Sequence, residues 1–279
     1  MLLPVFTVDE IIRRAITEDI PYIDLATDLL IDETQTGTAT FLAKADGVLC
    51  GIEVALRAIF LLDPTETHEL YKHDGDEVKK GDIIATVKAH TNALLKAERT
   101  ALNLLQHMSG IATATHTVVC EAQKGGKAQI ADTRKTTPGL RALEKYAVMT
   151  GGGHNHRFCL SDAAMIKDNH VDAVGGLKKA VDLLRRKVGH TVRIEVEARN
   201  FAELDEAISS GADIIMLDNM SCADMAKAVS LVGGRALTEA SGNVTLETVA
   251  AVAATGVDII SLGALTHSVT ALDISMKVK

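Results

Sequence analysis

Five basic side chains follow or lie between short apolar runs in the middle of the chain, and they are Arg134, Lys135, His156, Arg157 and Lys167. A guanidinium binds a carboxylate or a phosphate through two parallel hydrogen bonds, and an ammonium acts as a compact positive charge. The formal net charge of the whole chain is −8, so anion binding must come from a local basic cluster of this kind. The five residues predict a positive pocket suited to one or more carboxylates.

Carboxylates and small residues follow the later apolar runs. Glu197 ends the run VRIEVE and Asp218 ends the run DIIMLD, and their oxygen atoms can hold Mg²⁺ or the hydroxyls of a ribose. The residues small enough to let backbone N–H groups approach a phosphate come last, and they are Ser241, Gly242, Gly263 and Ala264. The last strands of α/β barrels commonly hold a phosphate in this way.

The elements that must bring these residues together recur from about residue 106 onward. Six runs rich in Val, Ile and Ala end in polar residues, at 128–132, 163–167, 192–197, 213–218, 236–241 and 258–263. Segments between them, such as FAELDEAISSG, have helical period and end in Gly, which is normal after a helix. Alternating strands and helices predict parallel βα units, and the lack of a GxGxxG fingerprint favours a barrel. Strand ends of a parallel barrel converge on one face, so these residues are predicted to form one site.

The first part of the chain, residues 1–105, has a different pattern. TGTATFLAKADGVLCGIEVA and DEVKKGDIIATVKAH have strand character with Gly and Asp turns, interleaved with helical segments such as VDEIIRRAITED. These features predict a separate α+β domain. A longer helix over roughly 92–120, with a possible break at Gly110, leads into the predicted barrel of residues 106–267.

The segment TGGGHNHR, residues 150–157, allows three interpretations: a phosphate loop, a His-x-His metal site, or a helix end followed by a turn. A zinc site needs further ligands, and Cys159 is the only obvious candidate nearby. The phosphate loop is better placed at Ser241 and Gly263. We therefore expect the glycines to end a helix and to free a turn that delivers His156 and Arg157 to carboxylates.

The stretch GDEVKKGDIIATV is similar to the hairpin of biotinyl or lipoyl carrier domains, which present a lysine in a tight turn. Here the segment KAHTNALL follows and leads into a helix. We expect an ordinary β-hairpin with Gly turns.

Composition argues against several classes of protein. The acidic charge, the absence of Trp and an aromatic content of 3% disfavour nucleic-acid binding. No apolar run approaches the ~20 residues of a membrane span, and the N-terminal apolar stretch is too short for a signal peptide. The four cysteines, Cys50, Cys120, Cys159 and Cys222, are widely spaced. They predict reduced thiols in a cytoplasmic protein.

Eight segments spread over nearly the whole chain resemble the quinolinate phosphoribosyltransferase family. They are EDIPYIDLATDLL, AERTALNLLQHMSGIA, DTRKTTPGLRALEKYAV, GGGHNHRFCLSDAAMIKDNH, IEVEARN, DIIMLDN, EASGNVTL and ISLGALTHSVTALDIS. The resemblance implies an N-terminal α/β sandwich domain and an open α/β barrel, in a type II phosphoribosyltransferase-like fold with residues 268–279 returning to the first domain. It implies a cytoplasmic homodimer, possibly a higher oligomer, whose site is shared between subunits. The implied reaction joins quinolinate to phosphoribosyl pyrophosphate with Mg²⁺, giving nicotinate mononucleotide, pyrophosphate and CO2 for de novo NAD biosynthesis.

The resemblance also implies roles for single residues. Residues that match those holding the quinolinate carboxylates are Arg134, His156, Arg157 and Lys167, with Arg99 donated across the dimer interface. Residues that match the catalytic ribose and pyrophosphate–metal end are Lys135, Glu197 and Asp218, the last two as metal ligands. Residues that match the 5′-phosphate cradle are Ser241, Gly242, Gly263 and His267. Asn243 departs from the family, because a second Gly is frequent there.

Two other reactions remain open at this point. One is a related phosphoribosyltransferase that uses another aromatic acid. The other is a barrel lyase in which Lys135 or Lys167 forms a Schiff base.

Overall fold

The computed structural model describes residues 3–279, which form two compact units. The described residues up to His116 form the first unit together with Thr136–Gly152 and Ala264–Lys279. The second unit contains Thr117–Lys135 and Gly153–Gly263. Each unit is built from several chain segments and has no single boundary along the sequence, so the linear division into 1–105 and 106–267 stays a prediction.

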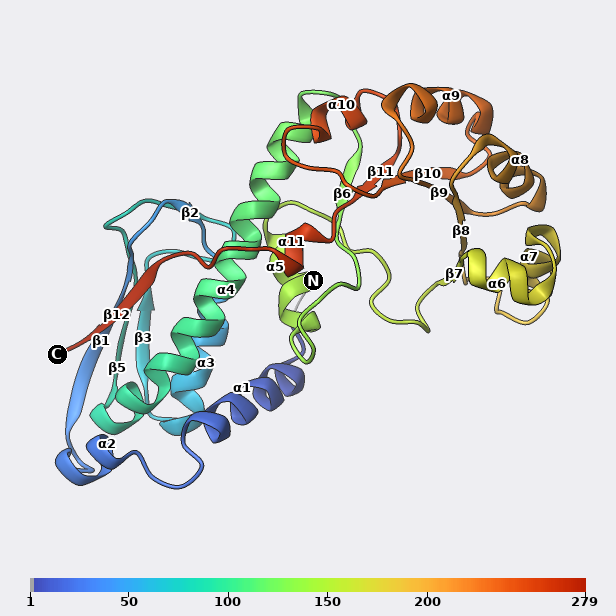
Figure 1. Cartoon of the computed structure of the whole chain (residues 1–279). Helices are drawn as coiled ribbons and strands as arrows, with labels where there is room; N and C mark the ends of the chain where they lie inside the picture. Colours follow the sequence, from blue (N-terminus) through green and yellow to red (C-terminus); the bar gives the residue numbers. More distant parts are fainter. Residues whose placement is uncertain (1–2) are drawn as a thin grey trace. The chain divides into compact units, whose positions relative to one another are not determined.

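The first unit is built on a four-stranded antiparallel sheet with the order β12-β1-β5-β3. Its strands are β1 (Thr36–Ala43), β3 (Thr67–Leu70), β5 (Ile83–His90) and β12 (Ile274–Val278). Ala39, Phe41 and Ala43 alternate along β1 with more exposed residues and are fully buried. One face of the sheet is therefore packed. The helices of this unit are α1 (Val5–Asp19), α2 (Leu25–Leu30), α3 (Ile52–Leu62), α5 (Arg141–Thr150) and α11 (Ala264–His267), and Figure 1 shows α3 beside the sheet.

The stretch GDEVKKGDIIATV does not form the expected hairpin. Its first strand, β4 (Glu77–Val78), pairs with β2 (Gly47–Val48), whereas its second strand is β5, which lies between β1 and β3. The turn between the two strands is closed by the Lys79 N–H, which donates to the Asp82 carboxylate at 3.0 Å. The pattern predicted both strands and the turn correctly. The pairing was wrong, because β5 buries its apolar residues in a core formed by distant segments.

Helix α4 (Thr91–Gln123) is continuous over 33 residues, so the possible break at Gly110 is absent. A Cβ at Gly110 would lie 2.4 Å from the Thr270 carbonyl oxygen, so glycine is needed there for close packing and not for a bend. The residues that share the apolar face of the predicted helix are all buried, and they are Leu94, Ala97, Ala101, Leu105 and Met108. Neither α4 nor any other described helix combines the length and the apolar character that crossing a membrane requires.

The second unit contains a six-stranded parallel sheet with the order β6-β11-β10-β9-β8-β7. Its strands are β6 (Gln129–Ala131), β7 (Ala164–Ile166), β8 (Ile194–Ala198), β9 (Ile214–Asp218), β10 (Leu237–Ser241) and β11 (Ile259–Ser261). All six predicted strands are present. Among the described residues β6 and β7 are the two edges and do not pair, so the predicted open α/β barrel is confirmed.

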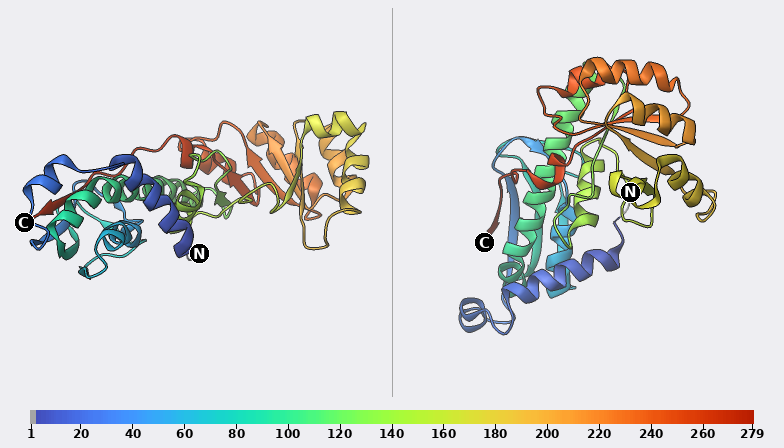
Figure 2. Two further views of the ribbon diagram at one scale, coloured as in Figure 1. Left: turned by 90° about the horizontal axis from the view of Figure 1, so that it is seen from below. Right: turned by 45° about the vertical axis from the view of Figure 1, so that its right-hand side comes forward.

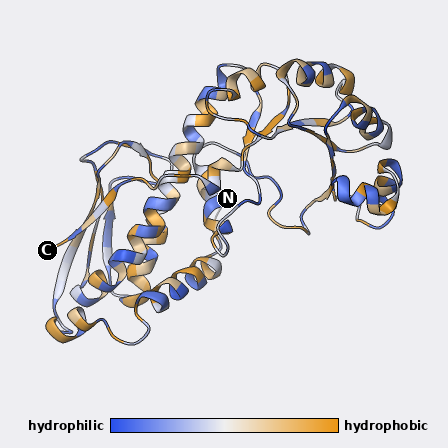
Figure 3. Ribbon diagram, in the orientation of Figure 1, coloured by the Kyte–Doolittle hydropathy of each residue, from blue (hydrophilic) through white to orange (hydrophobic). Residues whose placement is uncertain are grey.

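The helices of the barrel follow their strands in the expected order and are α6 (Asp168–Val174), α7 (Leu177–Arg185), α8 (Phe201–Ser210), α9 (Cys222–Val232) and α10 (Val249–Ala253). Side-chain oxygens of Asn200 and Ser221 cap the starts of α8 and α9, and Gly211 and Gly233 end them with positive φ. Apolar residues gather in the strands, while the surrounding helices carry both kinds (Figure 3). The right-hand view of Figure 2 shows α8 and α9 along the outside of this sheet.

Substitution of Gly110 by Ala should lower the free energy of unfolding by about 1–3 kcal/mol, because the added methyl group overlaps the backbone at Thr270. Urea unfolding of the variant measures the change. Gly189→Ala is the matched control, because a Cβ there meets no atom within 4 Å. Equal stability of the two variants would show that the close approach at Gly110 relaxes without cost.

Candidate active site

Most of the predicted site residues lie at or just beyond the C-terminal ends of the barrel strands. They are Arg134 and Lys135 after β6, Lys167 after β7, Glu197 in β8, Asp218 at the end of β9, Ser241 at the end of β10 and Gly263 after β11. The register pairs Ser241 with Asp218, which places the ends of β9 and β10 side by side. The parallel sheet therefore brings to one edge residues that are up to 129 positions apart (from 134 to 263) in the chain.

A cavity of about 640 Å³ lies in this unit and has two kinds of wall. Arg134, Arg157 and Lys167 form its basic part. The other lining residues, largely apolar, come from the segment before β7, from β7 and from the helices that follow, and they are Leu160, Ala164, Met165, Ile166, His170, Val174, Ala180, Leu183, Leu184 and Lys187. A flat, apolar ring that carries carboxylates matches both walls.

Each of two cations in this cavity is held by the protein. The Lys167 ammonium forms an ion pair with the Glu197 carboxylate, which links the ends of β7 and β8. The Arg157 guanidinium donates to the Ala163 carbonyl at 3.1 Å. Burial, followed by the positive charge of Arg134, lowers the pKa of Arg157 below its usual value. An anion bound beside Arg157 would relieve this repulsion.

The glycines of TGGGHNHR end a helix, as predicted. Helix α5 ends at Thr150, where Gly151 is the C-cap, and Gly152 follows with φ of +89°. The chain then pairs with the end of β6: the Asp132 N–H donates to the His154 carbonyl, and the His156 N–H donates to the Asp132 carboxylate at 2.8 Å. The Asp132 side chain thus fixes the turn that carries His156 and Arg157.

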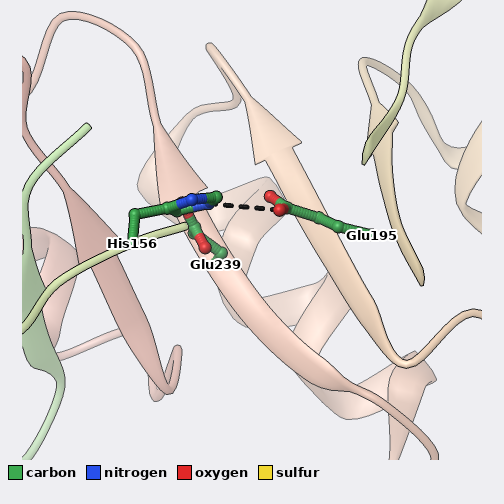
Figure 4. Close-up of side chains that lie close together, drawn as sticks. All are labelled: His156, Glu195 and Glu239. Atoms are coloured by element: carbon green, nitrogen blue, oxygen red, sulfur yellow. Dashed lines mark ion pairs between the residues drawn. The ribbon is translucent and has the colours of Figure 1, made fainter. Parts of the chain in front are cut away.

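The His156 ring points at two carboxylates (Figure 4). Its Nε2 lies 3.1 Å from an oxygen of Glu195 and 3.6 Å from one of Glu239, and both of these side chains are almost completely buried. The Arg157 N–H donates to Nδ1 of the same ring at 2.8 Å. Burial, followed by the charge of Glu195, raises the pKa of Glu239 to about 7.

Sequence reasoning missed Glu195 and Glu239 as site residues. Both carry a signal that was available: a charged residue stands two positions before a predicted site residue in an otherwise apolar strand. Since side chains two apart in a strand lie on the same face, Glu195 shares a face with Glu197, and Glu239 shares one with Ser241.

Two groups of residues must be weighed as metal ligands. Glu197 and Asp218 offer carboxylate oxygens at the ends of neighbouring strands, which is the hard donor set that Mg²⁺ prefers. His156, Glu195 and Glu239 also bring possible ligand atoms within 4.8 Å of one another. However, the ring accepts a hydrogen bond at Nδ1, so its neutral form carries a proton on Nε2, where a metal would need a lone pair. Of the two groups, Glu197 and Asp218 are therefore the better candidates for metal ligands.

The loops after β9 and β10 are joined above Gly242. Asn243 donates from its side-chain amide to the Asn219 side-chain oxygen at 3.0 Å, and both asparagines have positive φ, 51° and 56°. Asn is the non-glycine residue that adopts this conformation most readily. A Cβ at Gly242 would lie 2.2 Å from that Asn219 oxygen, so only glycine fits there. Asn243 therefore allows a left-handed turn without a second glycine after Gly242.

Two predicted site residues lie in the first unit. Arg99 is exposed on α4. His267 ends α11, and its Nδ1 lies 2.7 Å from the Ser268 hydroxyl. Their predicted roles toward substrate stay predictions.

Two family models match the chain. The model described as quinolinate phosphoribosyl transferase, N-terminal domain, matches residues 24–109, and the corresponding C-terminal domain model matches residues 111–277. A probable nicotinate-nucleotide pyrophosphorylase (carboxylating) from Bacillus subtilis is 45% identical over 269 residues, covering 96% of this chain and 92% of the relative. The nicotinate-nucleotide pyrophosphorylase (carboxylating) of Mycobacterium leprae is 44% identical over 95% of both chains.

Solved structures agree with these relatives. The crystal structure of NadC from Streptococcus pyogenes superposes with a TM-score of 0.96 at 41% identity and covers 100% of this chain and 99% of that one. The nicotinate-nucleotide pyrophosphorylase from Francisella tularensis superposes with a TM-score of 0.94 at 38% identity, with coverage of 100% and 98%.

Substitution of Gly242 by Ala should lower the free energy of unfolding by about 1–3 kcal/mol, because the residue has positive φ and the methyl group overlaps Asn219. Adding Asn219→Gly should recover part of this loss, since it removes the atoms that clash. Urea unfolding of the single and double variants measures both effects. Gly175→Ala, with φ of +81° and open space around it, reports the strain of positive φ alone. No recovery in the double variant would contradict the close approach.

Proposed function

The chain belongs to the quinolinate phosphoribosyltransferase family and has its activity, the decarboxylating transfer that forms nicotinate mononucleotide in NAD biosynthesis. From this premise we propose which residues carry out each part of the reaction. The cavity carries the proposal. Its basic part fits a dicarboxylate, and its apolar part fits a pyridine ring. We assign phosphoribosyl pyrophosphate as the donor of the sugar phosphate.

Arg134, Arg157 and Lys167 bind the quinolinate carboxylates in this proposal. Arg157 is the strongest candidate for the clamp on the 3-carboxylate, because it is partly buried and the nearby charge of Arg134 disfavours its own charge until an anion binds. The 2-carboxylate must leave as CO2, so it must be held less firmly in the transition state. The clamp therefore falls on the carboxylate that the product keeps.

The transfer step needs charge stabilisation at both reacting ends. The pyridine nitrogen attacks C1 of the ribose as pyrophosphate leaves, so positive charge builds on the sugar and negative charge on the leaving group. Glu197 and Asp218 would hold Mg²⁺, which supplies positive charge to the leaving pyrophosphate when it is bound. Lys135 adds to that stabilisation, and the two carboxylates also favour the cationic ribose. Quaternisation of the nitrogen then draws electrons into the ring and allows the C2–CO2 bond to break, and the electron pair left on C2 takes up a proton from solvent to give the C2–H of the product.

The 5′-phosphate is assigned to the other side of the barrel edge. Ser241 ends β10, Gly242 follows it and Gly263 follows β11, and residues this small let a phosphate approach the backbone. The family resemblance assigns His267 to the same phosphate. The locked turn at Gly242 supports this assignment, since a preorganised loop loses little entropy on binding a phosphate.

A homodimer in the cytoplasm completes the proposal. Large apolar side chains are exposed at the start of α1, before α2 and on α2, and they are Val5, Phe6, Tyr22, Leu25, Leu29 and Leu30. Exposed apolar surface of this kind supports a protein interface on this unit. Arg99 is exposed on α4 and can reach a neighbouring subunit, which supports a site shared across the dimer.

A Schiff-base lyase is disfavoured by one contact. The Lys167 side chain is engaged in an ion pair with Glu197, which does not direct it toward a substrate carbonyl. Release of CO2 and formation of nicotinate mononucleotide from quinolinate, dependent on phosphoribosyl pyrophosphate, tests the assigned reaction directly. Product from nicotinate in place of quinolinate would instead assign a related transferase.

Replacement of Arg157 by Ala should raise KM for quinolinate far more than KM for phosphoribosyl pyrophosphate. Loss of a buried charge-assisted contact costs on the order of 2–5 kcal/mol. Steady-state kinetics with each substrate varied in turn measure the split. Arg199→Ala is the control, since Arg199 is exposed and paired with Glu203 outside the cavity. Equal weakening of both substrates would move Arg157 away from the clamp.

Arg99→Ala and Glu197→Ala should each be inactive alone, yet mixing the two variants should restore part of the activity. Hybrid dimers would carry one site with both native residues. The assay is CO2 release after the purified variants are mixed and allowed to exchange subunits. Absence of recovery, with exchange verified by mass spectrometry of tagged chains, would contradict a shared site.

A further inference from the structure

Glu195 and Glu239 are acidic side chains that the proposed reaction does not use. Their side chains are 2% and 1% exposed, and one oxygen of each has no hydrogen-bond partner among the described residues. Burying a carboxylate is costly unless another group compensates it. Both carboxylates approach the imidazole of His156, which can compensate their burial.

The His156 ring is held at both nitrogen atoms. The Arg157 N–H donates to Nδ1, so that atom carries a lone pair and the proton lies on Nε2. Nε2–H then points between the two carboxylates, with Glu195 at 3.1 Å as the nearer acceptor and Glu239 at 3.6 Å. The neutral tautomer with its proton on Nε2 fits the contacts with Arg157 and Glu195, and the Arg157 N–H selects this tautomer.

The same contacts tie three strands to one turn. Asp132, after β6, accepts from the His156 backbone N–H, while Glu195 comes from β8 and Glu239 from β10. His156 in turn accepts from the backbone of Arg157. The position of the Arg157 main chain is therefore set by the orientation of the imidazole.

We propose that Glu195 and Glu239 are positioning residues that, through the Nε2–H of His156, hold the turn presenting Arg157 to the carboxylate that the substrate keeps. This inference rests on the proposed clamp at Arg157. It also gives His156 a different task from that implied by the family resemblance, since the ring nitrogens contact the protein and the effect on substrate passes through Arg157.

The proposal requires a hydrogen-bond acceptor at Glu195 and not a negative charge. Glu195→Leu removes the acceptor at similar volume and should raise KM for quinolinate at least tenfold, with a much smaller change for phosphoribosyl pyrophosphate. Glu195→Gln keeps a carbonyl oxygen and should bring KM for quinolinate back to within about threefold of the parent (~0.7 kcal/mol). The same pair at residue 239 should show a smaller difference, because its contact is longer. Failure of Gln to rescue would overturn the proposal.

A double-mutant cycle separates this inference from the proposed function. If Glu195 acts through Arg157, then Glu195→Leu should add little to KM for quinolinate in an Arg157→Ala background. Additive effects of the two substitutions would overturn the positioning role while leaving the clamp intact. If Arg157→Ala alone leaves KM for quinolinate unchanged, the clamp itself is misassigned and the inference falls with it.

Two further readouts report on His156 directly. In ¹⁵N-histidine-labelled protein, with the His156 signals assigned from a His156→Gln variant, Nε2 should be protonated and Nδ1 should not. A proton on Nδ1 would contradict the proposal. Titration of the parent protein with Zn²⁺ alone should show no stoichiometric binding at these three side chains. Glu195→Gln, which would abolish such binding, is the control. Such binding would assign the three side chains to a metal and overturn the positioning role.

Discussion

Charges of opposite sign share the interior of one barrel, and this constraint shapes the rest of the site. Burial lowers the pKa of Arg157 and raises that of Glu239 to about 7, so the barrel bears a cost for both signs. The two signs offset each other where they meet, as at Lys167 and Glu197. If every positive charge were fully neutralised by protein carboxylates, a bound dicarboxylate would gain little electrostatic stabilisation. The charge of Arg134 adds to the cost of burying Arg157, so an incoming dicarboxylate would be favoured beside Arg157.

The fold of the barrel could be predicted because its signals are local. Alternating apolar runs and helices capped by Gly211 or Gly233 are visible in any short window of sequence. The partners of the strands in the first unit could not be predicted in this way. β5 lies between β1 and β3 because of contacts between residues that are far apart in the sequence. Position 110 needs glycine because the backbone at Thr270 passes close to the helix there, which is also a contact between distant residues.

Residues of the candidate site could be predicted where residue type and strand position coincide, and at the turn that carries His156 and Arg157. Arg134, Lys167 and Glu197 stand at strand ends and are found there. Glu195 and Glu239 lie deeper, inside the strands, where a carboxylate is costly and therefore was not sought. The roles of Glu195 and Glu239 depend on the orientation of the His156 ring, and tertiary contacts fix this orientation. Composition and spacing show which groups are available, but the tautomer of a ring and the acceptor that selects it belong to the folded state.

The open seam of the barrel explains why the basic residues lie where they do. β6 and β7 are the two edge strands of the sheet and do not pair with each other, and Arg134 follows the first while Lys167 follows the second. A closed barrel fills its interior with layers of side chains. Here the cavity of about 640 Å³ is lined by Arg134 and by residues of β7, and so contains groups from both edges. The charge of Arg134 lowers the pKa of Arg157, which lines the same cavity. A substrate with two carboxylates would offset this repulsion, and the open barrel leaves room for it.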